Sequence, residues 1–101
     1  MSEEQKIEVV RGGDNVFEDL GFGTEEALNL KIRADLMLDL RKYIRARSWT
    51  HEQAAGFFGE TQARIAALVK GQIADFSVDQ LISLLSKAGM RVRVEVLSAA
   101  A

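Results

Sequence analysis

Cysteine is absent from the 101 residues of this chain. Its absence excludes disulfides, thiolate metal sites and a cysteine nucleophile, and nothing else in the sequence points to secretion. Histidine occurs once, as His51, so an imidazole-based metal site would lack a second histidine. We therefore expect neither a metal nor a cofactor.

Long hydrophobic runs are also missing. The sequence begins MSEEQK, which is polar and acidic with no apolar run behind it. We predict no signal peptide, no membrane span and a cytoplasmic location. The glycine residues lack the G-x-x-x-x-G-K spacing of a phosphate-binding loop, and no serine or cysteine nucleophile is evidently paired with His51. These absences indicate a protein that is not an enzyme.

Charge is present but uneven. Residues 1–40 contain 4 basic and 10 acidic side chains, a net charge of −6, whereas residues 41–72 contain 6 basic and 2 acidic side chains, a net charge of +4. The basic segment indicates either a local anion-binding face or a solvated helix surface. The hydrophobic share of 48% allows one domain with a modest core, and dimerisation is a natural supplement for so short a chain.

The first 23 residues form an arm before the regular pattern begins. Ile7–Val10 is a candidate short strand, and several glycines come between it and Thr24, so the arm is expected to be partly disordered or a short strand. Thr24 then fits the N-cap of a helix that extends to about Ala46. Leu30, Met37 and Leu38 widen its apolar surface, which predicts contact either with a partner or with a second side of its own domain.

Three short helices are predicted next from their start and stop signals. Thr50-x-x-Gln53 and Ser77-x-x-Gln80 are capping boxes, and Thr61 fits an N-cap. Each helix ends at a glycine, which tolerates the left-handed backbone of a helix C-terminus. These glycines are Gly59, Gly71 and Gly89.

The C-terminal segment changes from a helical to a strand period. Val92, Val94 and Val96 alternate with charged residues, which predicts a half-buried strand. A lone strand leaves its backbone unpaired, so it needs a partner. Either Ile7–Val10 or the same strand of a second subunit would serve, and we interpret the three valines as a dimer interface.

Spacing within the middle of the chain indicates a helix-turn-helix. Ala55 is small where two helices must cross, Gly59 permits the turn, and Ile65 and Leu68 point back into the core. In that motif the second helix lies in the major groove of DNA, and its N-terminal residues meet base edges. Small helical bundles can share this spacing.

The stretch "LRKYIRARSWTHEQAAGFFGETQARIAALVKGQIADFSVDQLISLLSKAG" resembles the XRE-type, lambda-repressor-like DNA-binding domain. With "GGDNVFEDLGF" before it and "GMRVRVEV" after it, the chain is similar to HigA-type antitoxins and related orphan regulators over residues 11–97. The resemblance implies a mainly α bundle of about five helices with a C-terminal β-strand used in dimerisation. Its domains would be the arm 1–23, the helix-turn-helix domain 24–89 and the dimerisation strand 90–97.

The resemblance also implies residue roles. Base-facing positions would be Gln62, Ala63, Ala66 and Ala67. Gln62 suits adenine and the alanines suit thymine methyl groups, although such residues also occur on plain solvent-exposed helices. Phosphate contacts are expected from the basic and capping residues of the motif, where Arg45 and Arg47 are otherwise an ordinary basic helix end. The expected phosphate contacts are Arg45, Arg47, Thr50, His51, Thr61, Arg64, Lys70 and Gly71.

Four positions depart from the family pattern. His51 stands where glutamine is common, Glu60 where the turn is usually apolar, Ala63 in place of a frequent proline, and Ala66 in place of a small polar residue. These changes remove hydrogen-bond donors from the reading face, so weak or narrow base recognition is expected. Phe57 falls on a normally outward position and is expected to contact either a partner or Trp49.

The predicted function is a dimeric transcriptional repressor that binds double-stranded DNA at a palindromic operator. The family further implies that it is the antitoxin of a toxin–antitoxin pair, partnered by a small basic ribonuclease toxin that the acidic first 40 residues would attract. An orphan regulator without a toxin, or a protein that mainly neutralises a toxin, are the alternatives.

Overall fold

The computed structural model describes residues 4–8, 17 and 20–96. Val9 and Val10 of the predicted N-terminal strand lie outside the described residues. Helices dominate, as the sequence predicts, and a strand follows the last helix. In chain order the elements are β1 (Glu4–Glu8), α2 (Thr24–Ala46), α3 (His51–Phe58), α4 (Gln62–Lys70), the 3-10 helix η1 (Ile73–Asp75), α5 (Val78–Lys87) and β2 (Arg91–Glu95).

Helix α2 is the longest element and supplies one wall of the core. Its N-cap is Gly23 and not Thr24, which is already the first helical residue. Leu36, Leu40 and Ile44 are buried along one side at helical spacing. Met37 is also buried, so it belongs to the core of its own domain, whereas Leu38 is 44% exposed.

The predicted capping signals form as local hydrogen bonds. The Thr50 hydroxyl accepts from the backbone N–H of Gln53 at 3.1 Å, and the Gln53 side chain accepts from the Thr50 N–H at 2.9 Å. Ser77 and Gln80 repeat this box at the start of α5. Gly59 ends α3 with φ 69°, a conformation in which any other residue is strained.

One hydrophobic core joins the helices. Phe58, Leu68 and Leu81 are fully buried within it. The Lys87 ammonium donates to the Phe58 carbonyl oxygen at 2.7 Å, which satisfies a carbonyl at the end of α3 from the far end of α5. The cluster of buried residues is Leu36, Met37, Leu40, Ile44, Ala54, Ala55, Phe58, Ile65, Leu68, Phe76, Leu81, Leu84 and Leu85.

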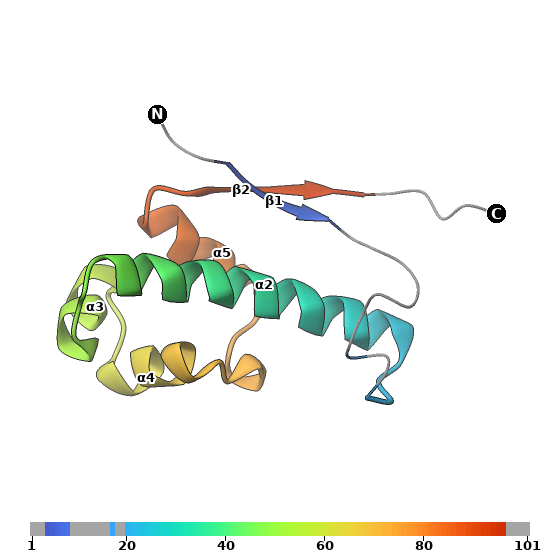
Figure 1. The fold of residues 1–101 in the computed structure, drawn as a ribbon, viewed down its shortest axis with the longest axis horizontal. Coiled ribbons are helices and arrows are strands. Elements are labelled where there is room, and N and C mark those ends of the chain that lie inside the picture. Colours follow the sequence, from blue (N-terminus) through green and yellow to red (C-terminus); the bar gives the residue numbers. More distant parts are fainter. Residues whose placement is uncertain (1–3, 9–16, 18–19, 97–101) are drawn as a thin grey trace.

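The two strands come from opposite ends of the chain and pair with each other. β1 and β2 are parallel, with Glu4 opposite Arg91 and Glu8 opposite Glu95. The sequence left open whether the last strand pairs within its own chain, and β1 is such a partner. Its described residues are Glu4–Glu8, which begin before the predicted Ile7 and include Ile7 and Glu8. In Figure 1 the strands lie on one side of α2 and α4 lies on the other.

Candidate nucleic-acid interface

Helices α3 and α4 form the pair of helices that the spacing predicts. Ala55 is buried where they approach each other, and Ile65 and Leu68 of α4 point into the core. The Glu60 N–H donates to the Ala55 carbonyl at 3.0 Å, so the chain reverses directly after Gly59. This short turn fixes the angle at which α4 is presented.

The outward surface of α4 is partly as predicted. Gln62 and Ala63 at its start are exposed, whereas Ala66 and Ala67 are half-buried. Ala67 packs against the core cluster. Of the four residues expected to face bases, the first two are thus open to a ligand. Base contact by Ala66 and Ala67 stays a prediction for side chains that are only partly exposed.

A family model described as a helix-turn-helix domain matches residues 16–97. The chain belongs to this helix-turn-helix family. None of the curated proteins compared with the sequence matches it. Helix-turn-helix domains place their second helix in the DNA major groove. This helix-turn-helix chain is a DNA-binding protein, and α4 is the second helix of its motif.

Arg64 has a structural position in the helix-turn-helix chain that the sequence did not predict. Its Nη1 donates to the Asp75 carbonyl at 2.8 Å, and its Nε lies 3.4 Å from a Glu60 carboxylate oxygen. Its guanidinium carbon stands 4.2 Å from the centre of the Phe76 ring. These contacts hold Arg64 against η1 and engage two of its three nitrogens, and the phosphate contact of Arg64 stays a prediction.

Gly71 closes the end of α4. Its N–H donates to the Leu68 carbonyl at 3.1 Å, and a phosphate near this amide stays a prediction. A side chain added at Gly71 would meet Arg41 Nη1 at 3.5 Å. Arg41 is therefore beside the end of α4, and it is a cation that the sequence analysis did not assign to the interface.

The start of α3 presents the other predicted polar residues. Thr50 and His51 are exposed there, and so is Thr61 at the start of α4. The Thr61 hydroxyl accepts from the Arg64 N–H at 3.1 Å. Both threonines therefore cap helices, and each hydroxyl that accepts in a cap keeps its own proton available for donation.

An aromatic cluster holds Arg47 next to the start of α3. The Arg47 guanidinium carbon lies 3.7 Å from the centre of the Tyr43 ring and 5.6 Å from that of Trp49. Phe57 packs on Trp49 with ring centres 4.8 Å apart, so of the two expected contacts of Phe57 the one with Trp49 is present. Stacking on Tyr43 reduces the conformational freedom of Arg47 and fixes a positive charge beside the Thr50 cap.

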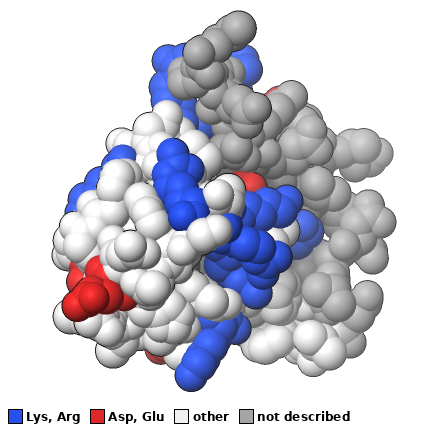
Figure 2. Space-filling model, turned by 60° about the vertical axis from the view of Figure 1, so that its left-hand side comes forward, with Lys and Arg blue, Asp and Glu red and all other residues white. Residues whose placement is uncertain are grey.

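Basic side chains gather around this surface. Figure 2 shows the end of the molecule that lies at the left of Figure 1, and Lys and Arg outnumber Asp and Glu on it. Arg45, Arg47 and Lys70 are exposed. The segment from residue 41 to 72, which supplies α3 and α4, carries 6 basic and 2 acidic residues. This distribution gives the helix-turn-helix a positive field that suits the phosphates of DNA.

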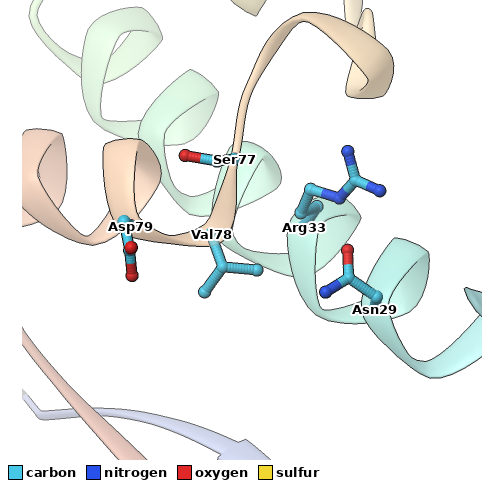
Figure 3. Close-up of a pocket in the computed structure, with 5 residues that line it drawn as sticks. All are labelled: Asn29, Arg33, Ser77, Val78 and Asp79. Atoms are coloured by element: carbon cyan, nitrogen blue, oxygen red, sulfur yellow. The ribbon is translucent and has the colours of Figure 1, made fainter. Parts of the chain in front are cut away.

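A separate hollow lies between α2 and the start of α5. It measures about 310 Å³ and is lined by Asn29, Arg33, Ser77, Val78 and Asp79 (Figure 3). Arg33 Nη1 donates to the carbonyls of Ile73 and Phe76 at 3.2 Å each, so this arginine links α2 to the segment before α5. None of these lining residues belongs to α3 or α4, and we do not assign the hollow to the DNA interface.

Metal ligands and membrane-spanning helices would indicate sites of another kind. Among the described residues, no three His, Cys, Asp or Glu side chains come together in a way that would hold a metal ion. No helix in the described part is both long and apolar enough to span a membrane.

Proposed function

We propose that this helix-turn-helix protein is a sequence-specific transcriptional repressor that acts in the cytoplasm as a dimer on a palindromic operator. The observation that carries the proposal is the exposed start of α4, with Gln62 and Ala63, in a helix-turn-helix whose first helix follows the stacked Arg47. The proposed function is not enzymatic. As a repressor it would act by occupying DNA.

In this proposal phosphates are held by side chains that surround α4. Lys70 is in the last turn of α4, and Arg41 lies beside Gly71 at its end. Arg47 and the first amides of α3 are the other groups in the proposed set. The positive end of the α3 dipole favours an anion there. Arg45, Thr50, His51 and Thr61 complete the proposed set of phosphate contacts.

Base recognition is expected to be narrow. Gln62 is the one exposed amide at the start of α4, and its neighbour Ala63 offers only a methyl group. A bidentate contact from glutamine selects adenine, whereas an alanine contact selects weakly for thymine. Most of the specificity would then come from two half-sites, whose centres lie roughly 34–36 Å apart for such dimers.

A gel shift with the DNA upstream of the protein's own gene tests the proposal. A specific complex that survives excess competitor DNA is expected at low salt. If the folded dimer gives no specific complex under these conditions, the proposed repressor function is rejected. Selection of bound sequences from a random pool then identifies the operator independently of its position in the genome.

Gln62→Ala is expected to relax the preference at one base pair in each half-site. The lost discrimination should be about 1–3 kcal/mol per site, because the bidentate contact to one base disappears. The measurement is a comparison of dissociation constants for the operator and for its variants at that base pair. Equal discrimination by both proteins would exclude Gln62 from base contact.

Lys70→Ala is expected to weaken binding to all DNA sequences by a similar factor. The slope of log K against log salt concentration should become less steep by about 1, because one phosphate contact and its counterion are lost. The slope is measured between low and moderate salt for operator and random DNA. A loss confined to the operator would contradict a phosphate role for Lys70.

An antitoxin role is a further part of the proposal. Leu20, Phe22 and Leu38 are large apolar side chains exposed on or before α2, and residues 1–40 have a net charge of −6. A small basic ribonuclease toxin would complement both properties. On the same helix, burial raises the pKa of the Asp39 carboxyl. The Lys42 charge lowers this pKa, and the Asp35 charge raises it further.

Co-expression with the product of a small, basic neighbouring reading frame tests the antitoxin role. Rescue of growth, together with co-purification of the two chains, is the expected result. Leu38→Lys should weaken the complex, because it places a cation in an apolar contact with a basic partner. Absence of rescue by the wild-type chain would leave an orphan regulator as the function.

A further inference from the structure

The hollow between α2 and the start of α5 lies apart from the helix-turn-helix and is large enough for a small ligand. Its volume of about 310 Å³ falls at the lower end of the range of about 300–1,000 Å³ that is usual for small-molecule sites. Its walls combine one cation, Arg33, and one anion, Asp79, with the neutral polar side chains of Asn29 and Ser77 and the apolar side chain of Val78 (Figure 3). Such a lining suits a ligand that is polar at one end and apolar at the other.

Arg33 enters the hollow with part of its hydrogen-bonding capacity unused. Its Nη1 donates to the Ile73 and Phe76 carbonyls. Its Nε is buried and has no hydrogen-bond partner among the described residues. A buried donor without an acceptor costs free energy, and nearly all such donors in proteins are paired with protein, water or a bound group. In Figure 3 the guanidinium lies beside Asn29, one helical turn earlier on α2, where a ligand in the hollow can supply the acceptor.

The unused edge of the guanidinium matches a carboxylate. The Nε and Nη2 hydrogens of Arg33 point in parallel, and two parallel N–H groups bind the two oxygens of a carboxylate in bidentate fashion. The start of α5 forms the opposite wall, with Val78 as the first helical residue. The first amides of a helix have no acceptor within it, and the helix dipole favours negative charge at this end. Both walls therefore favour the same charged group.

The other lining residues limit the ligand to one negative charge and a short apolar chain. The Asp79 carboxylate repels a dianion such as phosphate more strongly than a singly charged group. Arg33 is the one cation in the lining, so it neutralises a single charge. Val78 is half-buried and offers an apolar contact. A small monocarboxylate with a short apolar chain fits these groups best.

The hollow is connected to α4 through residues 73–76. Arg33 of α2 holds this segment through two of its carbonyls. Arg64 of α4 donates to the Asp75 carbonyl of the same segment and lies over the Phe76 ring. A carboxylate on the second edge of Arg33 leaves the Nη1 bonds in place and restrains the guanidinium. The segment that positions Arg64 then has less freedom to lose when α4 binds DNA, which favours binding.

We propose that the hollow between α2 and α5 binds a small monocarboxylate, held by Arg33 and the first amides of α5, and that the bound ligand strengthens DNA binding by α4 through residues 73–76. The ligand site goes beyond the proposed function. The effect on DNA rests on the DNA-binding part of that function.

An NMR titration of the full chain tests the ligand site without DNA. The probes are acetate, isovalerate and benzoate, each compared with its uncharged amide at constant ionic strength. The carboxylates should shift the Val78 and Asp79 amide signals to saturation, with isovalerate binding most tightly and the amides giving no shift. No saturable shift with any carboxylate overturns the site. Equal shifts by the amides overturn recognition of the charge, and tighter binding of inorganic phosphate overturns the choice of a monocarboxylate.

Two substitutions place the ligand in the hollow. Arg33→Lys keeps the charge and removes the bidentate edge, so isovalerate should bind roughly tenfold more weakly. Because Arg33 also supports residues 73–76, Asp79→Asn is the second variant. Asp79 is exposed, and loss of its charge should strengthen isovalerate binding roughly twofold or more.

Asp75→Asn is the matched control for Asp79→Asn. Asp75 is exposed and does not line the hollow, so the same change in net charge should leave isovalerate binding unaltered. An equal gain in both variants, or no gain in Asp79→Asn, overturns the placement of the ligand in the hollow.

Fluorescence anisotropy with labelled operator DNA tests the effect on α4. Saturating isovalerate should lower the dissociation constant for DNA roughly twofold or more, and bound DNA should strengthen isovalerate binding by the same factor. Isobutyl alcohol is the uncharged control and should have no effect. Unchanged or weaker DNA binding by a chain that binds isovalerate overturns the link to α4. A folded chain that binds no DNA overturns the proposed function and this link, whereas the NMR titration still decides the ligand site.

Discussion

Ala63→Glu is expected to weaken DNA binding by roughly a hundredfold or more, because a carboxylate facing the duplex costs several kcal/mol. Ala63 is exposed in the first turn of α4, next to Gln62. That turn contains no acidic residue, and a negative charge there is favourable to the helix dipole. The thermal stability should therefore be unchanged or slightly higher, so lost binding cannot be assigned to unfolding.

Ser83→Glu provides the control for Ala63→Glu. Ser83 is exposed on α5, outside the helix-turn-helix, and the substitution adds the same charge to the whole protein. Fluorescence anisotropy with labelled operator DNA should show near wild-type affinity for this variant. Equal losses in both variants would indicate a general charge effect, and undiminished binding by Ala63→Glu would place the DNA elsewhere than at α4.

Phe58→Ala is expected to lower the free energy of unfolding by about 3–5 kcal/mol, the usual cost of removing a buried phenylalanine. The Phe58 ring is fully buried at the end of α3 and lies 4.9 Å from the Phe57 ring, centre to centre. A domain of this size has a total stability of about 5–15 kcal/mol, so much of it would be lost. Urea denaturation followed by far-UV circular dichroism measures the change.

Phe57→Ala removes the same side chain one position earlier. Phe57 is 43% exposed, so about 1 kcal/mol is the expected loss. A comparable loss in the two variants would mean that the exposed ring of Phe57 is covered, for instance by a second chain. The contrast between the two variants therefore also reports on the surroundings of the aromatic cluster.

Local signals in the sequence predict the starts and ends of helices well. The capping boxes at Thr50 and Ser77 and the turn at Gly59 form as expected, because each involves residues within a few positions of one another. The helix-turn-helix follows from such boundaries and from the inward spacing of Ile65 and Leu68. The N-cap predicted at Thr24 is one residue late, because Gly23 takes the cap position without a side chain that reveals it.

Contacts between distant residues are not predictable in this way. Arg64 has the spacing of a phosphate ligand, yet its partner is the Asp75 carbonyl, eleven positions further on. Arg41 comes next to Gly71 only because α2 crosses the end of α4. The alternation of valines in β2 predicts a strand. It does not predict which strand lies beside β2, because the same alternation suits any neighbouring strand, so only the structure shows the pairing with β1.

The parallel pairing of β1 with β2 has a consequence for the order of events during synthesis. β1 precedes the helices in the chain and β2 follows them, so the sheet cannot form while the helices between them are still emerging from the ribosome. Contacts between distant parts of a chain form slowly, whereas the helices rest on local contacts. The helical domain can therefore fold ahead of the sheet, and a chain cut short before β2 would carry the folded helices of the helix-turn-helix without the strand pair.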